Sequence, residues 1–112
     1  MTLGAGCAAS LTNPLINMVC FVETCACTAD ARDYRGNVSV TESGRTCQAW
    51  DAQSPHSHSR TADNYPGFGL EGGHNHCRNP DGEPWAWCYT TDPNKRWDFC
   101  SRAVIPACDG ET

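Results

Sequence analysis

Two acidic residues and a group of aromatic residues lie close together between Asn75 and Cys100. Asp81 and Glu83 are separated only by Gly82, so both carboxylates can converge on one ammonium through charge-assisted hydrogen bonds. Flat aromatic faces bury an alkyl chain and attract its cationic end, and an arginine fork binds a carboxylate bidentately. The aromatic and basic residues of this stretch are Trp85, Trp87, Tyr89, Trp97 and Arg96. This combination of acids, rings and base is what a site for a zwitterionic ligand needs.

Each of these residues also has an ordinary structural interpretation. Asp81 and Glu83 are compatible with solvated loop acids, or with acids paired to Arg78. Trp87 and Trp97 are compatible with core packing, because aromatic residues often pack on cystines in disulfide-rich folds. The binding interpretation is favoured only for the whole set, in which polar and aromatic groups converge.

Cysteine content limits the kind of fold that this chain can form. The 112 residues include 9 cysteines, 10 glycines and 7 prolines. So short a chain buries a modest share of its surface, and this density of cysteine is typical of disulfide scaffolds in oxidising compartments. Zinc ligation would favour paired CxxC spacings, and none occur. We therefore predict a secreted, extracellular protein, although the first residues lack the basic segment of a secretory signal.

Charge and motifs exclude several classes of function. The formal net charge of −5 argues against nucleic acid or an anionic membrane as the main partner. No apolar run approaches the length of a membrane span. No serine lies in a nucleophile-elbow or protease signature. We expect a protein that is not an enzyme and needs no cofactor.

The elements expected from the pattern are few and short. Residues 1–24 form an N-terminal extension whose apolar run over 15–22 predicts one strand, with a pairing partner in this chain or in another. Alternation over 38–41 predicts a further strand that ends at a turn. Two more strands are expected around 87–91 and 97–99. The expected core anchors of the long loop region are Trp50 and Leu70.

A series of longer motifs identifies a family. In chain order these are YRG at 34–36, CQAW at 47–50, PHSH at 55–58, NYPGFGL at 64–70, CRNPDGE at 77–83 and WCYTTDPNKRWDFC at 87–100. With these motifs in this order, residues 25–108 resemble a kringle domain, which covers about three quarters of the chain. The resemblance implies a small disulfide-rich fold, mostly loops with short antiparallel β-strands, preceded by the extension and followed by a tail at 109–112.

The resemblance also implies which cysteines pair. The family pattern joins the first cysteine to the sixth, the second to the fourth and the third to the fifth. Carried over, it gives Cys27–Cys108, Cys47–Cys88 and Cys77–Cys100. The cysteines left for an extra or interchain disulfide are Cys7, Cys20 and Cys25, with Cys25 and Cys27 interchangeable. Since their number is odd, one is left for a link to another chain unless it is reduced or capped.

Lysine-binding kringles further imply a role for each residue of the candidate site. Two acids hold the ligand's ammonium, aromatic rings flank its methylenes, and bases hold its carboxylate. The matching positions are Asp81 and Glu83 for the acids, Trp87, Tyr89 and Trp97 for the rings, and Arg60 and Arg96 for the bases. The ordinary interpretation of the two arginines is surface charge. Glu83, where the family has aspartate, and the extra Trp85 are expected to alter the depth of this trough.

Two departures from the family lie at the ends of the domain. Neither Cys25 nor Cys27 has the usual spacing to Tyr34, and Cys100 and Cys108 lie further apart than usual, with SRAVIPA between them. The histidines at 56, 58, 74 and 76 suggest a metal site. We expect none, because the adjacent Cys77 belongs to a disulfide and PHSH occurs in metal-free kringles.

Two functions follow. The first is an extracellular module that binds lysine-like groups on protein partners. The second is a structural subunit of an extracellular oligomer or fibril, assembled through the apolar extension and the odd cysteine. Asn37-Val38-Ser39 is in addition an acceptor sequence for N-glycosylation.

Overall fold

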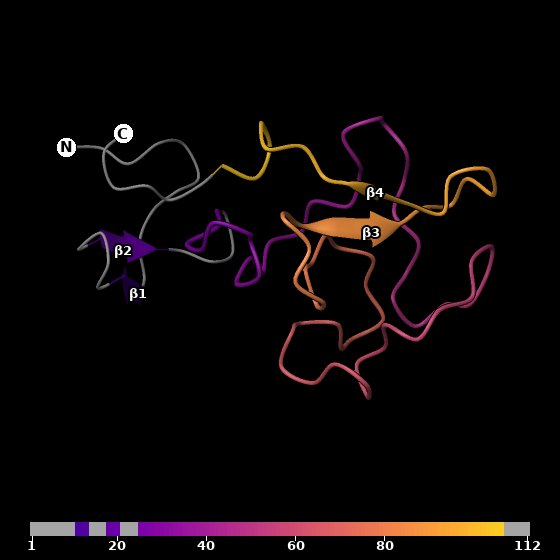
Figure 1. The fold of residues 1–112 in the computed structure, drawn as a ribbon, viewed down its shortest axis with the longest axis horizontal. Coiled ribbons are helices and arrows are strands. Elements are labelled where there is room, and N and C mark those ends of the chain that lie inside the picture. The colour runs from indigo at the N-terminus through magenta and orange to yellow at the C-terminus, as the bar shows by residue number, and fades with distance from the viewer. Residues whose placement is uncertain (1–10, 14–17, 21–24, 107–112) are drawn as a thin grey trace.

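The computed structural model describes the backbone of residues 11–13 and 18–20 and all atoms of residues 25–106 (Figure 1). Its strands form two antiparallel pairs, and long loops surround the second pair. The strands are β1 (Leu11–Asn13), β2 (Met18–Cys20), β3 (Trp87–Tyr89) and β4 (Trp97–Phe99). The predicted fold class, a loop-rich disulfide domain with short antiparallel strands, is confirmed. The described residues contain no helix with the length and apolarity needed to cross a bilayer.

The N-terminal strands form a hairpin instead of the single strand expected over 15–22. Leu11 pairs with Cys20, and Asn13 pairs with Met18. The strand partner therefore comes from the same chain. Asn13 and Pro14 form a dipeptide typical of turns. The prediction of a single strand did not take this turn signal into account. The division of the chain at residue 24 stays a prediction.

The second pair of strands, β3 and β4, forms the central hairpin of the domain. Trp87 pairs with Phe99 and Tyr89 with Trp97. The connecting loop is built by Asp92, whose carbonyl and carboxylate accept the backbone N–H groups of Lys95 and Asn94 at 3.0 and 2.9 Å. Aspartate is favoured in such turns because its side chain reaches the backbone two residues on. The strand expected over 38–41 is reduced to isolated bridges from residues 40 and 41.

Two cystines lie side by side under this hairpin. Cys47 is bonded to Cys88, and Cys77 to Cys100, as the family pattern implies. All four residues are buried, and the Sγ atoms of Cys47 and Cys77 are 4.0 Å apart. Although the four sulfurs lie within 4.8 Å of one another, they are oxidised and offer no thiolate to a metal.

The remaining cysteines belong to the two ends of the domain. Cys25 and Cys27 are both disulfide-bonded, and no free thiol occurs in the described part of the chain. Cys7 and Cys108 lie outside the described residues, and only the backbone of Cys20 in β2 is described. The predicted bond from Cys27 to Cys108 and the link to another chain therefore stay predictions.

Aromatic side chains complete the core around the cystines. Trp50 and Leu70, the anchors expected from the sequence, are only 1% and 2% exposed. The Trp50 ring lies edge-on to Trp87 and Tyr89, with ring centroids 5.2 and 5.9 Å apart. Its indole N–H donates to the carbonyl of His76 at 2.7 Å. The core is thus built from rings and cystines where larger proteins use aliphatic layers.

A buried arginine joins three loops. The Arg78 guanidinium donates to the carbonyls of Gly36, Cys77 and Gly69 at 2.7, 2.8 and 3.1 Å. Burial lowers the pKa of Arg78 to about 10. Gly69 has a φ of +78°, and a Cβ there would meet Arg35 side-chain atoms at 2.7 Å, so glycine is required. Because Arg78 binds carbonyls, the alternative in which it pairs with the candidate acids is wrong.

Candidate functional site

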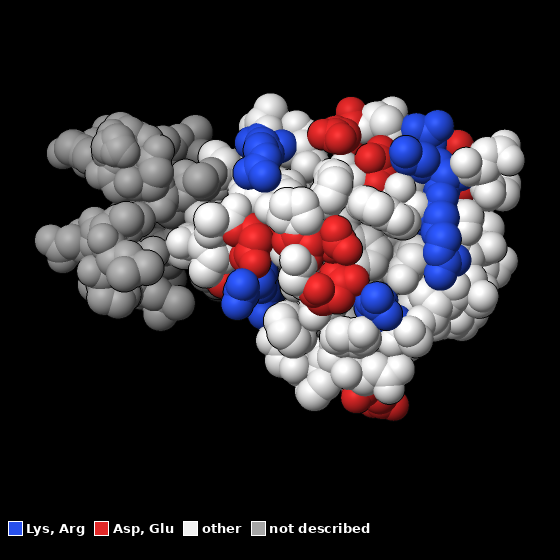
Figure 2. All heavy atoms as spheres, viewed as in Figure 1, with Lys and Arg blue, Asp and Glu red and all other residues white. Residues whose placement is uncertain are grey.

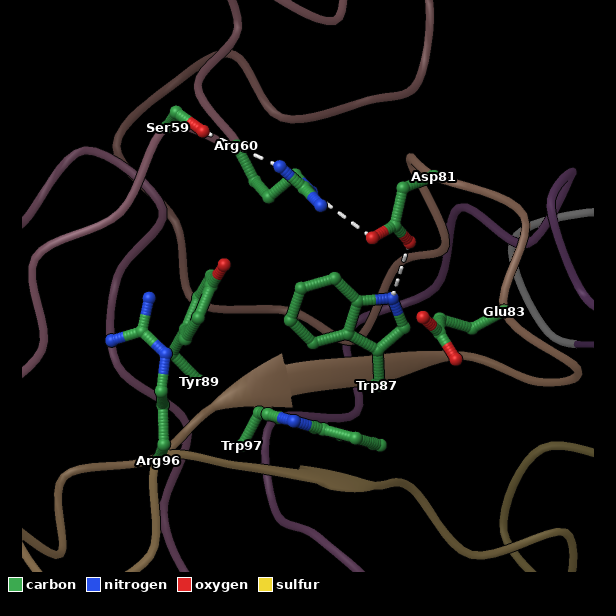
Figure 3. A pocket seen from close by; sticks show the side chains of 8 residues that line it. All are labelled: Ser59, Arg60, Asp81, Glu83, Trp87, Tyr89, Arg96 and Trp97. Atoms are coloured by element: carbon green, nitrogen blue, oxygen red, sulfur yellow. Dashed lines mark hydrogen bonds and ion pairs between the residues drawn. The ribbon is translucent and has the colours of Figure 1, made fainter.

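One open cavity of about 240 Å³ brings the predicted site residues together (Figure 3). Asp81 and Glu83 stand at one end of it, Tyr89 and Arg96 at the other, and tryptophan rings lie between (Figure 3). The residues around this cavity, called the trough below, are Ser59, Arg60, Asp81, Glu83, Trp87, Tyr89, Arg96 and Trp97. Figure 2 shows acidic side chains gathered near the centre of one face, with basic side chains on both sides of them.

The central hairpin positions the rings. Trp87 and Tyr89 alternate in β3 and therefore face the same side, while Cys88 points the other way into its cystine. Trp97 lies opposite Tyr89 in the register of β4, and directly paired residues point to the same face of a sheet. The ring centroids of Trp87 and Trp97 are 5.9 Å apart, at an angle of 69°.

The rings differ in how far they belong to the core. Trp87 is 3% exposed and contacts Trp50, so it serves the core and the trough together. Trp97 is 40% exposed, which leaves its face free for a ligand. Trp85, expected beside the trough, does not line it; this residue precedes β3, so the alternation of the strand does not apply to it.

The two acids have different surroundings. One Asp81 oxygen accepts the indole N–H of Trp87 at 3.1 Å, and the other accepts the Arg60 Nε–H at 3.0 Å. Glu83 is held by its backbone, because its N–H donates to the side-chain oxygen of the buried Asn79 at 2.9 Å. Among the described residues no cation lies within 4.0 Å of the Glu83 carboxylate. Glu83 thus differs from Asp81, whose carboxylate is paired with Arg60.

The two bases occupy opposite ends of the trough. Arg96 extends over the Tyr89 ring, with its guanidinium 5.1 Å from the ring centroid. Arg60, expected beside Arg96 to hold a carboxylate, instead forms an ion pair with Asp81, and this carboxylate raises the pKa of Arg60. The physical reason is proximity, since the Asp81 carboxylate lies 3.0 Å from the Arg60 Nε atom.

Sequence reasoning missed two residues that support Arg60. The His58 ring stacks on Tyr89 at 4.3 Å between centroids. Its Nδ1 accepts the backbone N–H of Arg60 at 3.1 Å, and its Nε2–H donates to the carbonyl of Ala52 at 3.1 Å. Ser59 lies beside Arg60 and accepts one of its N–H groups at 3.3 Å. The signal available for both was their position directly before Arg60 in the chain.

Lowering the pH below 6.5 is expected to lower the free energy of unfolding through the histidines. Burial lowers the pKa of His58, His74 and His76 below their ordinary value of 6.5. The unfolded chain binds protons near pH 6.5 that the folded chain takes up only at lower pH, so stability falls as pH falls from that value.

Urea denaturation at several values between about pH 7.5 and pH 5 measures this slope. His58→Gln retains groups that can donate to Ala52 and accept from Arg60, and it should make the slope shallower. A free energy of unfolding that does not change over this range would contradict the assignment, because the aspartate pKa values that shift start from 3.8 and are lowered.

Comparison with known proteins identifies the family. Residues 19–108 match the model of the kringle domain. The chain belongs to the kringle family. A similar human protein is putative apolipoprotein(a)-like protein 2, which is 52% identical over 73 residues, or 65% of this chain. The aligned part spans about half of that relative, 54% of its length.

The family match has two consequences. It begins at residue 19, inside β2, so the matched kringle reaches into the extension that was expected to end at residue 24. Kringle domains in general bind other proteins, which makes a surface trough a reasonable place to look for a binding site.

Proposed function

We propose that this kringle is a non-enzymatic extracellular module that binds lysine-like, zwitterionic groups on protein partners. The observation that carries the proposal is the trough itself, where two carboxylates, three aromatic rings and two guanidinium groups line one open cavity. Acids at one end and Arg96 at the other are separated by rings, as an ammonium, an alkyl chain and a carboxylate in line require (Figure 3).

A lysine-like ligand fits this order of groups. Its ammonium would approach Glu83 and share Asp81, its methylenes would lie along Trp87 and Trp97, and its carboxylate would reach Arg96. The exposed position of the trough keeps the electrostatic attraction weak and sensitive to salt. We expect a dissociation constant on the order of micromolar to millimolar for a small ligand.

Titration with 6-aminohexanoic acid tests the proposal. Tryptophan fluorescence should change with added ligand, since Trp97 is 40% exposed beside the expected methylenes. 1-Pentanol, which lacks both the ammonium and the carboxylate, should cause a much weaker change and serves as the control. No fluorescence change and no calorimetric heat at about 10 mM of the zwitterion would exclude the proposed binding.

Replacing Arg60 by glutamine should strengthen the binding of amines that lack a carboxylate. The substitution frees Asp81 from its 3.0 Å ion pair. Because pairs with partly exposed partners contribute little, we expect the affinity for 1-aminopentane to rise only about two- to fivefold. Isothermal titration calorimetry measures the change.

Arg32→Gln is the matched control for this variant. It breaks a comparable ion pair, from Arg32 to Asp30 at 2.9 Å, which lies outside the trough. The two variants lose the same charge, so a general electrostatic effect would appear in both. Weaker binding of 1-aminopentane to Arg60→Gln would show that Arg60 supports the site and does not compete for Asp81.

The disulfide bonds of the fold support an extracellular location. The buried cystines form in oxidising compartments, and six described cysteines are disulfide-bonded. The Asn37 side chain is exposed, as an acceptor for glycosylation must be. We include glycosylation at Asn37 in the proposal, and a mass shift on treatment with peptide N-glycosidase of the secreted protein tests it.

The hairpin of β1 and β2 favours a second function, assembly into an extracellular oligomer or fibril. In the described part of the chain this sheet has only two strands, and an isolated two-stranded sheet is marginal in water. Its edges can pair with a second copy. Light scattering and non-reducing electrophoresis test this function. A chain that is monomeric by both methods would exclude it.

A further inference from the structure

A second cavity of about 310 Å³ shares no residue with the trough. Trp85 and the segment after β4 both contribute to its lining. The lining residues are Glu42, Pro84, Trp85, Phe99, Cys100, Ser101, Arg102 and Ala103. Trp85 and the segment after Cys100, two features noted in the sequence, therefore meet in one place.

Trp85, which lines this cavity, carries a buried hydrogen-bond donor without a partner. Trp85 is only 3% exposed, and its indole Nε1–H has no acceptor among the described residues. A buried donor left unpaired costs about 1–3 kcal/mol, and each such group in a folded protein requires an explanation. A ligand oxygen that accepts this N–H would remove the cost.

A cation lies directly over the same ring. The Arg102 guanidinium is 4.0 Å from the centroid of the Trp85 ring. Arg102 is exposed, and within the described part of the chain no carboxylate lies within 4.0 Å of its guanidinium. Its guanidinium therefore has N–H donors available for an anion.

The backbone around these two groups is well fixed. Ser101 accepts the N–H of Ala103 on its hydroxyl at 3.0 Å, and its carbonyl accepts the N–H groups of Val104 and Ile105, both at 3.2 Å. The Ile105 side chain is fully buried and anchors this turn. Donors held in place before binding lose little entropy when a ligand arrives.

We propose that this second cavity binds a carboxylate attached to an apolar body. One carboxylate oxygen accepts the Nε1–H of Trp85 while Arg102 swings from the ring to form an ion pair with the same group. The apolar body then packs against Pro84 and Phe99. A peptide C-terminus and an acidic side chain both offer this chemistry.

Replacing Glu42 tests which ligand charge the cavity prefers. It lines the same space and is exposed, so it repels a carboxylate that binds to Arg102. Glu42→Gln should therefore increase the affinity for an apolar carboxylate, whereas Arg102→Gln should decrease it. These opposite effects separate a carboxylate site from a second site for zwitterions, in which loss of Glu42 would weaken binding.

The test uses the indole N–H resonances of the ¹⁵N-labelled chain, which has four tryptophans. Hexanoate should move the Trp85 resonance downfield, with an affinity that falls roughly tenfold in Arg102→Gln. The affinity should rise about two- to fivefold in Glu42→Gln and stay unchanged in Arg32→Gln. The Trp87 resonance reports the trough separately, so 6-aminohexanoic acid shows whether that site works in the same sample.

Each outcome decides the proposal. A Trp85 resonance that stays in place at about 20 mM hexanoate, or moves equally in the wild type and Arg102→Gln, overturns it, as does weaker binding to Glu42→Gln. If hexanoate binds, two further compounds identify the kind of carboxylate. N-acetyl-leucine carries a C-terminal carboxylate, and N-acetyl-glutamic acid α-amide carries only a side-chain carboxylate. Unchanged Trp50 resonances show that each variant is folded.

Discussion

Joint replacement of Cys47 and Cys88 by alanine is expected to lower the free energy of unfolding by about 4 kcal/mol. The bond joins residues separated by 41 positions, and without it the unfolded chain gains the entropy of that loop. The total free energy of unfolding of a small domain is only about 5–15 kcal/mol. The variant should therefore be unfolded in part at body temperature.

Removal of the other central cystine provides the control. Cys77 and Cys100 are separated by only 23 positions, so their joint replacement should cost about 0.5 kcal/mol less. Urea denaturation followed by tryptophan fluorescence measures both variants. A Cys47/Cys88 variant as stable as the wild type would show that ring packing, and not loop closure, sustains the domain.

Asp81→Asn is expected to lower the affinity for 6-aminohexanoic acid by roughly 10- to 100-fold, because one charge-assisted hydrogen bond to the ammonium is lost. The substitution is conservative in shape. The asparagine oxygen can still accept the indole N–H of Trp87, which bonds Asp81 at 3.1 Å. The Trp87 ring should therefore keep its position, and the measured loss of affinity is then due to the lost charge of Asp81.

A matched variant separates this local effect from the effect of net charge. Asp63 is an exposed acid that does not line the trough, so Asp63→Asn changes the net charge equally and should leave affinity unchanged. Calorimetry at low and moderate salt completes the test. Equal affinities of Asp81→Asn and the wild type would remove Asp81 from the ammonium site.

Much of the trough was predictable because the family motifs carry its residues in order. Asp81, Trp87 and Arg96 lie in two unbroken motifs, and their cavity follows from one hairpin and two cystines. The pairing of Arg60 with Asp81 was not predictable, since these residues are 21 positions apart and their contact depends on how two loops meet. Whether these residues bind a ligand stays a prediction.

Two other features escaped the sequence for physical reasons. Trp85 precedes Trp87 by two residues and by alternation would share the face of β3 that lines the trough, yet it lines another cavity. Strand periodicity carries no information outside the strand. His58 was considered only as a metal ligand, but both of its ring nitrogens bond to backbone groups. Such contacts leave no periodic pattern in a chain made mostly of loops.

The 4.0 Å separation between the Cys47 and Cys77 sulfurs makes the two central bonds one redox unit. If a reductant opens either bond, the released thiolate lies beside an intact disulfide, and thiolates attack such bonds through mixed disulfides. Partial reduction should therefore scramble the pairing of the two central bonds. A reductant acting on this kringle would yield isomers with exchanged partners, and trapping the thiols with acid would preserve them for mapping.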